Sequence, residues 1–152
     1  MLLDAWIGNS DRYHENWALV DYEEKSYLAP TYDHASSLGR NESDKRREQR
    51  LKTRDTGFSV EAYANKCKSC LYANVGDKQP LKTLDAFFEA AKLYPKAANI
   101  WLDSLAEVSA DRTLELFERI PNCCISSTAI EFAQKILAIN HNKLLEFRNE
   151  LS

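Results

Sequence analysis

The fold is decided by the stretch Gly8-Asn9-Ser10-Asp11-Arg12-Tyr13-His14-Glu15-Asn16, together with Tyr32-Asp33-His34-Ala35-Ser36-Ser37-Leu38-Gly39. Between these polar stretches lie two short β-prone runs, residues 17–20 and 27–29, separated by the polar residues 21–26. This arrangement predicts a small antiparallel hairpin with a polar turn. Because a hairpin reverses the chain, we expect the two polar stretches to lie side by side.

Three side chains in these stretches follow the order that phosphoryl transfer requires. Asp11 and Asn16 stand five residues apart on one polar loop, and Asp33 follows on the second stretch. One carboxylate would orient a hydroxyl nucleophile, while the amide and the second carboxylate would hold Mg²⁺, which prefers hard oxygen ligands. The alternative is purely structural, with Asp11 and Asn16 capping a turn and Asp33 capping a loop.

The rest of the chain reads as helical. Apolar residues at helical spacing precede Gly8, which predicts a first helix ending in a glycine C-cap. From residue 59 onward we expect only helices. They are predicted over residues 59–71, over 80–94, from Pro95 onward, from a cap at Ser109 or Asp111 to Pro121, and from the capping box Thr128-Ala129-Ile130-Glu131 to the C-terminus.

These patterns predict a mainly α fold with a small N-terminal β-hairpin, in a single domain of residues 1–152. Within it we expect residues 1–39 to form the polar loops and hairpin, residues 40–57 a mobile basic loop, and residues 58–152 a helical bundle. The basic loop is either a solvated segment or a rim that receives phosphates or an acidic substrate. Its candidate rim residues are Arg40, Lys45, Arg46 and Arg47.

The overall composition is that of an ordinary globular protein. The chain has 152 residues, of which 44% are hydrophobic and 28% charged, and its net charge is −3. This balance does not favour binding to nucleic acid or to a membrane, and we see neither a long apolar run nor a signal peptide, so we expect a cytoplasmic protein. The four cysteines include Cys67 and Cys70 at half-zinc-site spacing, but Cys123 and Cys124 are adjacent and make a poor second half. We expect unpaired thiols.

The polar loops resemble the C-terminal kinase region of HipA-like proteins, bacterial serine/threonine kinases best known as toxins of toxin–antitoxin modules. The resemblance is carried by Asp4-Ala5-Trp6-Ile7-Gly8-Asn9-Ser10-Asp11-Arg12, by Asn16-Trp17 and by Leu28-Ala29-Pro30-Thr31-Tyr32-Asp33. The catalytic loop is also similar to that of phosphatidylinositol 3- and 4-kinases. The resemblance implies a helical kinase C-lobe, with Asp11 as catalytic base, Asn16 and Asp33 as metal ligands, and Mg²⁺ and ATP as cofactors.

Four further residues are candidates for supporting this site: Asn9, Arg12, His14 and His34. The family pattern often has histidine two residues after the catalytic aspartate, whereas this chain has Tyr13 there and His14 next. His14 either substitutes for that histidine or supports the loop by hydrogen bonding.

The groups that grip a nucleotide are missing from the sequence. The glycines Gly8, Gly39, Gly57 and Gly76 form no phosphate-cradling array. We therefore expect the chain alone to be a very poor kinase, working with an N-lobe that lies upstream or on a separate chain. A truncated first helix would also leave an apolar patch exposed near residues 2–7.

Two other readings stay open. The chain could be a non-catalytic kinase remnant that serves as a helical interaction module, within a toxin–antitoxin system and with an antitoxin as partner. It could also be a helical partner of DNA or of a repressor that uses the basic stretch. The acidic residues that balance this stretch, and the lack of a helix-turn-helix pattern, count against the latter.

Overall fold

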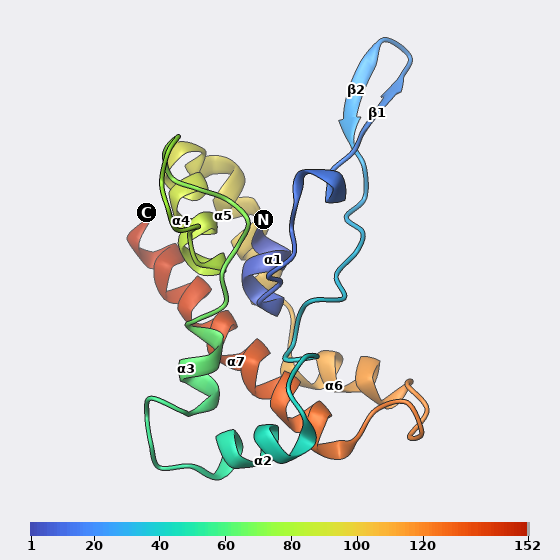
Figure 1. The fold of residues 1–152 in the computed structure, drawn as a ribbon. Helices are drawn as coiled ribbons and strands as arrows, with labels where there is room; N and C mark the ends of the chain where they lie inside the picture. The colour runs from blue at the N-terminus through green and yellow to red at the C-terminus, as the bar shows by residue number, and fades with distance from the viewer. Residues whose placement is uncertain (152) are drawn as a thin grey trace.

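The structure is a computed structural model that describes residues 1–151. It is mainly helical, with one small antiparallel hairpin near the N-terminus, as the sequence predicts (Figure 1). The elements in chain order are α1 (Leu2–Ile7), the 3₁₀ turn η1 (His14–Asn16), β1 (Leu19–Tyr22), β2 (Lys25–Leu28), α2 (Asp44–Lys52), α3 (Val60–Ala64), α4 (Thr83–Leu93), α5 (Pro95–Ala106), α6 (Ala110–Glu118) and α7 (Ser127–Glu150).

Helix α7 is the axis of the molecule. It is 24 residues long and contacts each of the other α-helices, with α4 and α5 toward its C-terminal end, α1 and α3 near its middle, and α2 and α6 toward its N-terminal end (Figure 1). Two groups of buried apolar side chains lie along it. The larger joins α1, α4 and α5 to Leu144 and Phe147, and the smaller joins α3 to Phe132 and Ile136.

Helix α1 ends where the sequence predicts. Gly8 adopts the left-handed conformation with φ 63°, and the backbone N–H of Asn9 donates to the carbonyl of Asp4 at 2.9 Å. Left-handed backbone is easiest for glycine because it has no Cβ. The chain therefore leaves the helix sharply and enters the first polar loop.

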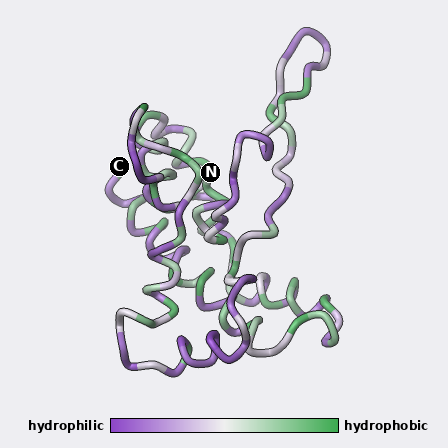
Figure 2. Tube along the Cα trace, viewed as in Figure 1, coloured by the Kyte–Doolittle hydropathy of each residue, from purple (hydrophilic) through white to green (hydrophobic). Residues whose placement is uncertain are grey.

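The hairpin projects away from the helices (Figure 1), and its strands lie closer to the tip than predicted. Tyr22 pairs with Lys25, so the turn is only Glu23–Glu24, and both turn residues have positive φ values of 47° and 62°. Such turns match the right-handed twist of the strands, which explains why the polar residues next to the turn join the ladder. All strand residues are exposed, and the tip is hydrophilic (Figure 2).

Residues 40–57, expected as a mobile loop, contain the well-formed helix α2. Its N-cap is Ser43, whose hydroxyl accepts a hydrogen bond from the backbone N–H of Arg46 at 3.4 Å. An ion pair between Lys52 and Glu48, one turn apart, adds to it. The helix is polar apart from Leu51, as the hydropathy colouring shows (Figure 2), so an apolar-stripe criterion overlooks it.

Two predicted helix boundaries, on either side of residues 65–82, are wrong. The first post-loop helix stops at Ala64 instead of near residue 71, and α4 begins at Thr83 instead of Pro80. The reason is long-range backbone pairing, because the N–H of Ser69 donates to Leu81 and the N–H of Leu81 to Leu71, both at 2.8 Å.

The last helix begins with Ser126 as its N-cap, not at the predicted Thr128 capping box. The hydroxyl of Ser126 accepts from the N–H of Ala129 at 3.0 Å. By contrast, the predicted cap at Ser109 and the predicted Pro95 start are confirmed. Within residues 1–151, none of the helices combines the length and apolar content that crossing a bilayer needs.

Candidate functional site

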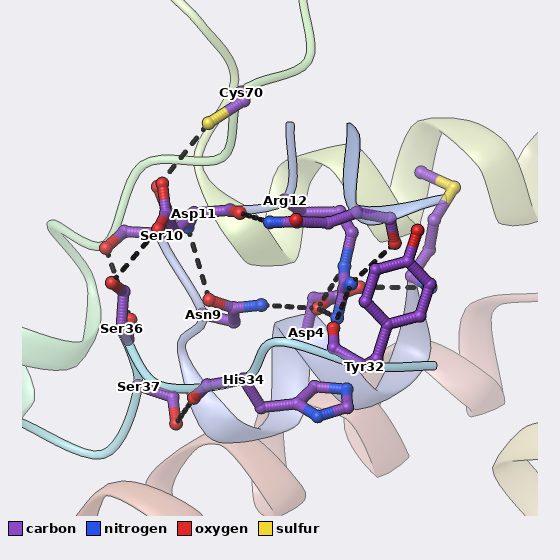
Figure 3. Close-up of polar contacts among 12 residues, drawn as sticks. Asp4, Asn9, Ser10, Asp11, Arg12, Tyr32, His34, Ser36, Ser37 and Cys70 are labelled. Carbon is purple, nitrogen blue, oxygen red and sulfur yellow. Dashed lines mark hydrogen bonds and ion pairs between the residues drawn. The ribbon is translucent and has the colours of Figure 1, made fainter. Parts of the chain in front are cut away.

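A buried ion pair anchors the first polar loop to helix α1. Asp4 and Arg12 are only 7% and 3% exposed, and the guanidinium donates to Asp4 Oδ1 through Nε at 2.9 Å and Nη2 at 2.8 Å (Figure 3). The remaining nitrogen of Arg12, Nη1, donates to the carbonyls of Asn16 at 3.0 Å and Tyr32 at 2.8 Å. One side chain therefore holds both polar stretches, on either side of the hairpin, against the same helix.

Asn9 completes this buried network. It is 0% exposed, and its Nδ2 donates to Asp4 Oδ1 at 2.8 Å. Its Oδ1 accepts from the backbone N–H of Asp11 at 3.2 Å (Figure 3). Asn9 thereby links Asp4 on α1 to the backbone of Asp11, the candidate catalytic residue.

The charge of Asp4 is stabilised by its partners. Burial by itself raises the pKa of this carboxyl, but the hydrogen bonds from Arg12 and Asn9, helped by the N-terminal amine and the charge of Arg12, leave the pKa below its ordinary value of 3.8. The Met1 amine lies 3.4 Å from Asp4 Oδ2. Asp4 is therefore ionised at neutral pH, and the pair is a fixed structural element.

Asp11 lies where the two polar loops meet. Its carboxylate Oδ2 accepts from the Ser36 hydroxyl at 3.3 Å, and the backbone N–H of Ser10 donates to the Ser36 carbonyl at 3.1 Å (Figure 3). The carboxylate is only partly buried. It is thus oriented by the second loop while remaining accessible, which suits a group that accepts a proton from a substrate hydroxyl.

Asn16 closes the same loop. Its amide Nδ2 donates to the Asp11 carbonyl at 2.6 Å, so the nitrogen is committed to the loop and the amide oxygen is the atom available to a ligand. The structure therefore brings Asp11 and Asn16 together, as their spacing predicts.

Asp33 lies on the facing segment and is exposed. It directly follows Tyr32, whose carbonyl Arg12 holds, and its φ of 53° is left-handed. Left-handed backbone is uncommon outside glycine, although aspartate tolerates it better than most residues. Asp11, Asn16 and Asp33 therefore all come from segments fixed by the same buried arginine.

The donor set of these residues fits Mg²⁺ in chemical type, because carboxylate and amide oxygens are its preferred protein ligands. Within residues 1–151 there is no cluster of three or more His, Cys, Asp or Glu side chains that could hold a metal without other ligands. An ion here would need the amide oxygen of Asn16 and oxygens from a phosphate as well. Such shared coordination is usual for Mg²⁺ in phosphoryl-transfer sites.

The two candidate supporting histidines differ in environment. The side chain of His14 is 88% exposed and lies 3.6 Å from Glu15, so the structure places it at the surface. His34 is partly buried, and its Nε2 atom is buried without a hydrogen-bond partner among the described residues.

The four residues of the candidate basic rim differ in whether they take part in ion pairs. Arg40 and Lys45 are exposed. Arg46 lies 3.0 Å from Glu42, while Arg47 pairs with Asp44 and donates to the carbonyls of Gly39 and Arg40. Arg46 is exposed as well, but it and Arg47 are engaged in these ion pairs, so Arg40 and Lys45 remain the better candidates for contact with an anionic ligand.

Three residues at the site were not predicted to serve it. Asp4 and Ser36 carry the network described above, and Cys70 Sγ contacts the Ser10 carbonyl at 3.4 Å, which joins the segment after α3 to the first loop (Figure 3). Asp4 could have been found, since a lone acid in an apolar helical run predicts a buried partner. All four cysteines are free, and burial raises the pKa of the Cys67 thiol to about 11.

Comparison with solved structures reveals a kinase-like fold. The chain is similar to the crystal structure of the Helicobacter pylori proinflammatory kinase CtkA, with a TM-score of 0.68 and 20% sequence identity. The match covers 94% of this chain and 50% of that chain, so this protein spans half the length of the kinase it is similar to. No protein-family model matches the sequence, and neither does any curated protein.

Proposed function

We propose that this chain is the C-terminal catalytic half of a HipA-like, ATP- and Mg²⁺-dependent serine/threonine protein kinase. The observation that carries the proposal is the buried contact of Arg12 with the carbonyls of Asn16 and Tyr32. It fixes the Asp11–Asn16 loop and the Asp33 loop relative to one another, in a chain whose fold is kinase-like.

Each candidate residue has a distinct role in this proposal. Asp11, oriented by Ser36, accepts the proton of the acceptor hydroxyl as the phosphoryl group is transferred. Asn16 and Asp33 hold Mg²⁺, which neutralises the charge on the phosphate oxygens when bound. Arg40 and Lys45 supply positive charge at the rim for the phosphates or for an acidic substrate.

The nucleotide-binding half is proposed to lie outside this sequence, either upstream or on a separate chain, in a cytoplasmic protein. The chain spans half of the kinase it is similar to, and its sequence lacks a phosphate-cradling glycine array. The isolated chain is accordingly expected to show no measurable ATP turnover.

The metal site can be tested on the isolated chain by NMR. Mn²⁺ with ATP is expected to broaden the amide signals of residues 11–16 and 33–36, since a paramagnetic ion affects nearby nuclei. Asp33→Asn should abolish this broadening, whereas Asp21→Asn, a control at the exposed hairpin, should leave it unchanged. Broadening confined to the hairpin tip, or unaffected by Asp33→Asn, would contradict the assignment.

Activity tests the proposal as a whole. Transfer that appears when a nucleotide-binding half is added should be lost in Asp11→Asn and Asp33→Asn. Strong Mg²⁺-dependent turnover by the isolated chain, abolished by Asp11→Asn, would show that the nucleotide-binding half is not missing.

A non-catalytic interaction module, with an antitoxin as partner in a toxin–antitoxin system, is the second candidate. The exposed apolar side chains on the hairpin favour it, because Leu19, Tyr22 and Leu28 are 70%, 63% and 58% exposed. This candidate predicts the absence of Mn²⁺–ATP broadening together with binding of the partner.

A further inference from the structure

An apolar groove of about 570 Å³ lies between α1, α4, α5 and the base of the hairpin. It agrees with the expected apolar patch near residues 2–7. Its lining includes Leu2, Trp6, Phe87, Tyr94, Trp101 and Leu105.

The rim of the groove exposes large apolar side chains. Tyr94, Trp101 and Leu3 are 69%, 63% and 36% exposed. Trp6 donates its indole N–H to the Leu137 carbonyl at 3.2 Å, so its polar edge is satisfied on α7 while its ring lines the groove. A continuous apolar surface of this kind marks a binding site, because it is unfavourable in water.

The groove is continuous with the candidate site. Trp17, Leu28 and Thr31 line it at the hairpin end, and the Arg12 guanidinium lies 5.8 Å from the centre of the Trp17 ring. Whatever covers the groove therefore reaches the residues that immediately flank the Asp11–Asn16 and Asp33 loops.

We infer that this groove is the docking site for an amphipathic helix of the nucleotide-binding half of the kinase. The inference rests on the proposed function, and it identifies where and how that partner attaches. The kinase that this chain is similar to contains a further half with no counterpart here, and that half is the source of the docked helix in this inference.

The chemistry of the lining favours a helix over other occupants. Apart from Thr31 and Ser104, and the ring edges of Tyr94, Trp6, Trp17 and Trp101, the groove side chains are aliphatic, Met or Phe. A docked strand would find little to satisfy its backbone N–H and carbonyl groups, whereas a helix satisfies them internally. A small ligand would normally require several convergent polar groups, which this lining does not supply. Helix-in-groove docking needs only an apolar stripe.

The test is binding of the half of CtkA that this chain does not match, produced as a separate polypeptide and titrated into the full chain without nucleotide or metal. We expect a complex in which amides of α1 and α5 are protected from hydrogen exchange. Trp101→Glu should raise the dissociation constant by about tenfold or more, as expected for the loss of an aromatic anchor. The matched control is Ile100→Glu, which changes the preceding residue of α5. Ile100 is 66% exposed but lies outside the groove lining, so the change should have little effect.

A second pair repeats the comparison at the junction of α4 and α5. Tyr94 lines the groove, so Tyr94→Glu should weaken binding. Leu93 is 74% exposed and lies outside the lining, so Leu93→Glu should have little effect. Absence of binding, or equal weakening by both members of each pair, would overturn the inference. So would sedimentation showing a dimer of this chain that Trp101→Glu dissociates, because a second copy would then occupy the groove.

Failure of the inference can be told apart from failure of the proposed function. Asp11→Asn should bind the partner as the unmodified chain does. A complex that forms through the groove but shows no phosphoryl transfer would reject the kinase assignment and leave the docking site standing.

Discussion

Arg12 contacts three separate segments of the chain from a buried position, through Asp4 and the carbonyls of Asn16 and Tyr32. Arg12→Met would leave the Asp4 carboxylate buried without its main counter-charge, and losing one partner of a buried pair typically costs about 3–5 kcal/mol. We therefore expect a large fall in the free energy of unfolding, measured by urea denaturation.

The control for this prediction is Arg46→Met. Arg46 is 57% exposed in its ion pair with Glu42, and exposed pairs contribute at most about 1 kcal/mol. Similar losses for the two variants would show that Arg12 is not the anchor. The double variant Asp4→Leu/Arg12→Met should recover part of the loss, since it removes both buried charges.

The same pair predicts how stability depends on pH. The pKa of Asp4 is below 3.8 in the folded protein, so its ionised form contributes stability that is complete above 3.8 and is lost as the pH falls through the lower folded value. Urea midpoints should therefore drop on acidification through this window. In Asp4→Asn the midpoint should start lower at neutral pH and fall less steeply, and an unchanged acid slope would contradict the prediction.

At the scale of elements, Gly39, at the end of the second polar loop, packs closely against Phe132 of helix α7. Its φ is 71°, and a Cβ there would lie 2.4 Å from Phe132 Cε1. Gly39→Ala therefore combines backbone strain of about 1 kcal/mol with a clash against a fully buried ring. We expect a markedly lower melting temperature.

Gly76→Ala is the matched comparison for Gly39. Its φ is 94°, yet nothing lies within 4 Å of the added Cβ, so only the backbone strain should appear. The difference between the two variants measures the packing of the loop on α7. Equal effects would mean that Phe132 moves aside freely.

At the scale of the whole molecule, α7 contributes side chains to both buried clusters, so we expect them to unfold as one cooperative unit. Phe132 and Leu144 are each 0% exposed and lie in different clusters on the same helix. Phe132→Ala and Leu144→Ala should each cost on the order of 2–5 kcal/mol. Each variant should retain a single unfolding transition, with coincident near- and far-ultraviolet circular dichroism curves. Two separated transitions would instead indicate independent clusters.

Local patterns were sufficient to predict much of this molecule. The end of α1 at Gly8, the start of α5 at Pro95 and the cap at Ser109 all depend on residues within one helical turn. The loop from Asp11 to Asn16 follows from their spacing, and the Asn16 amide closes it by donating to the Asp11 carbonyl. The chemical roles of Asp11, Asn16 and Asp33 stay predictions.

By itself, the sequence determined the helical class, the hairpin and the positions of the candidate site, because propensity, capping and turn chemistry act over a few residues. Only the tertiary structure decided that α3 stops at Ala64, since residues 69–71 pair with Leu81, and that Asp4 and Ser36 serve the site. It also decided that α1, α4 and α5 leave an apolar groove beside the candidate site. These features depend on contacts between distant segments, whose energies arise only when packing removes the groups from water.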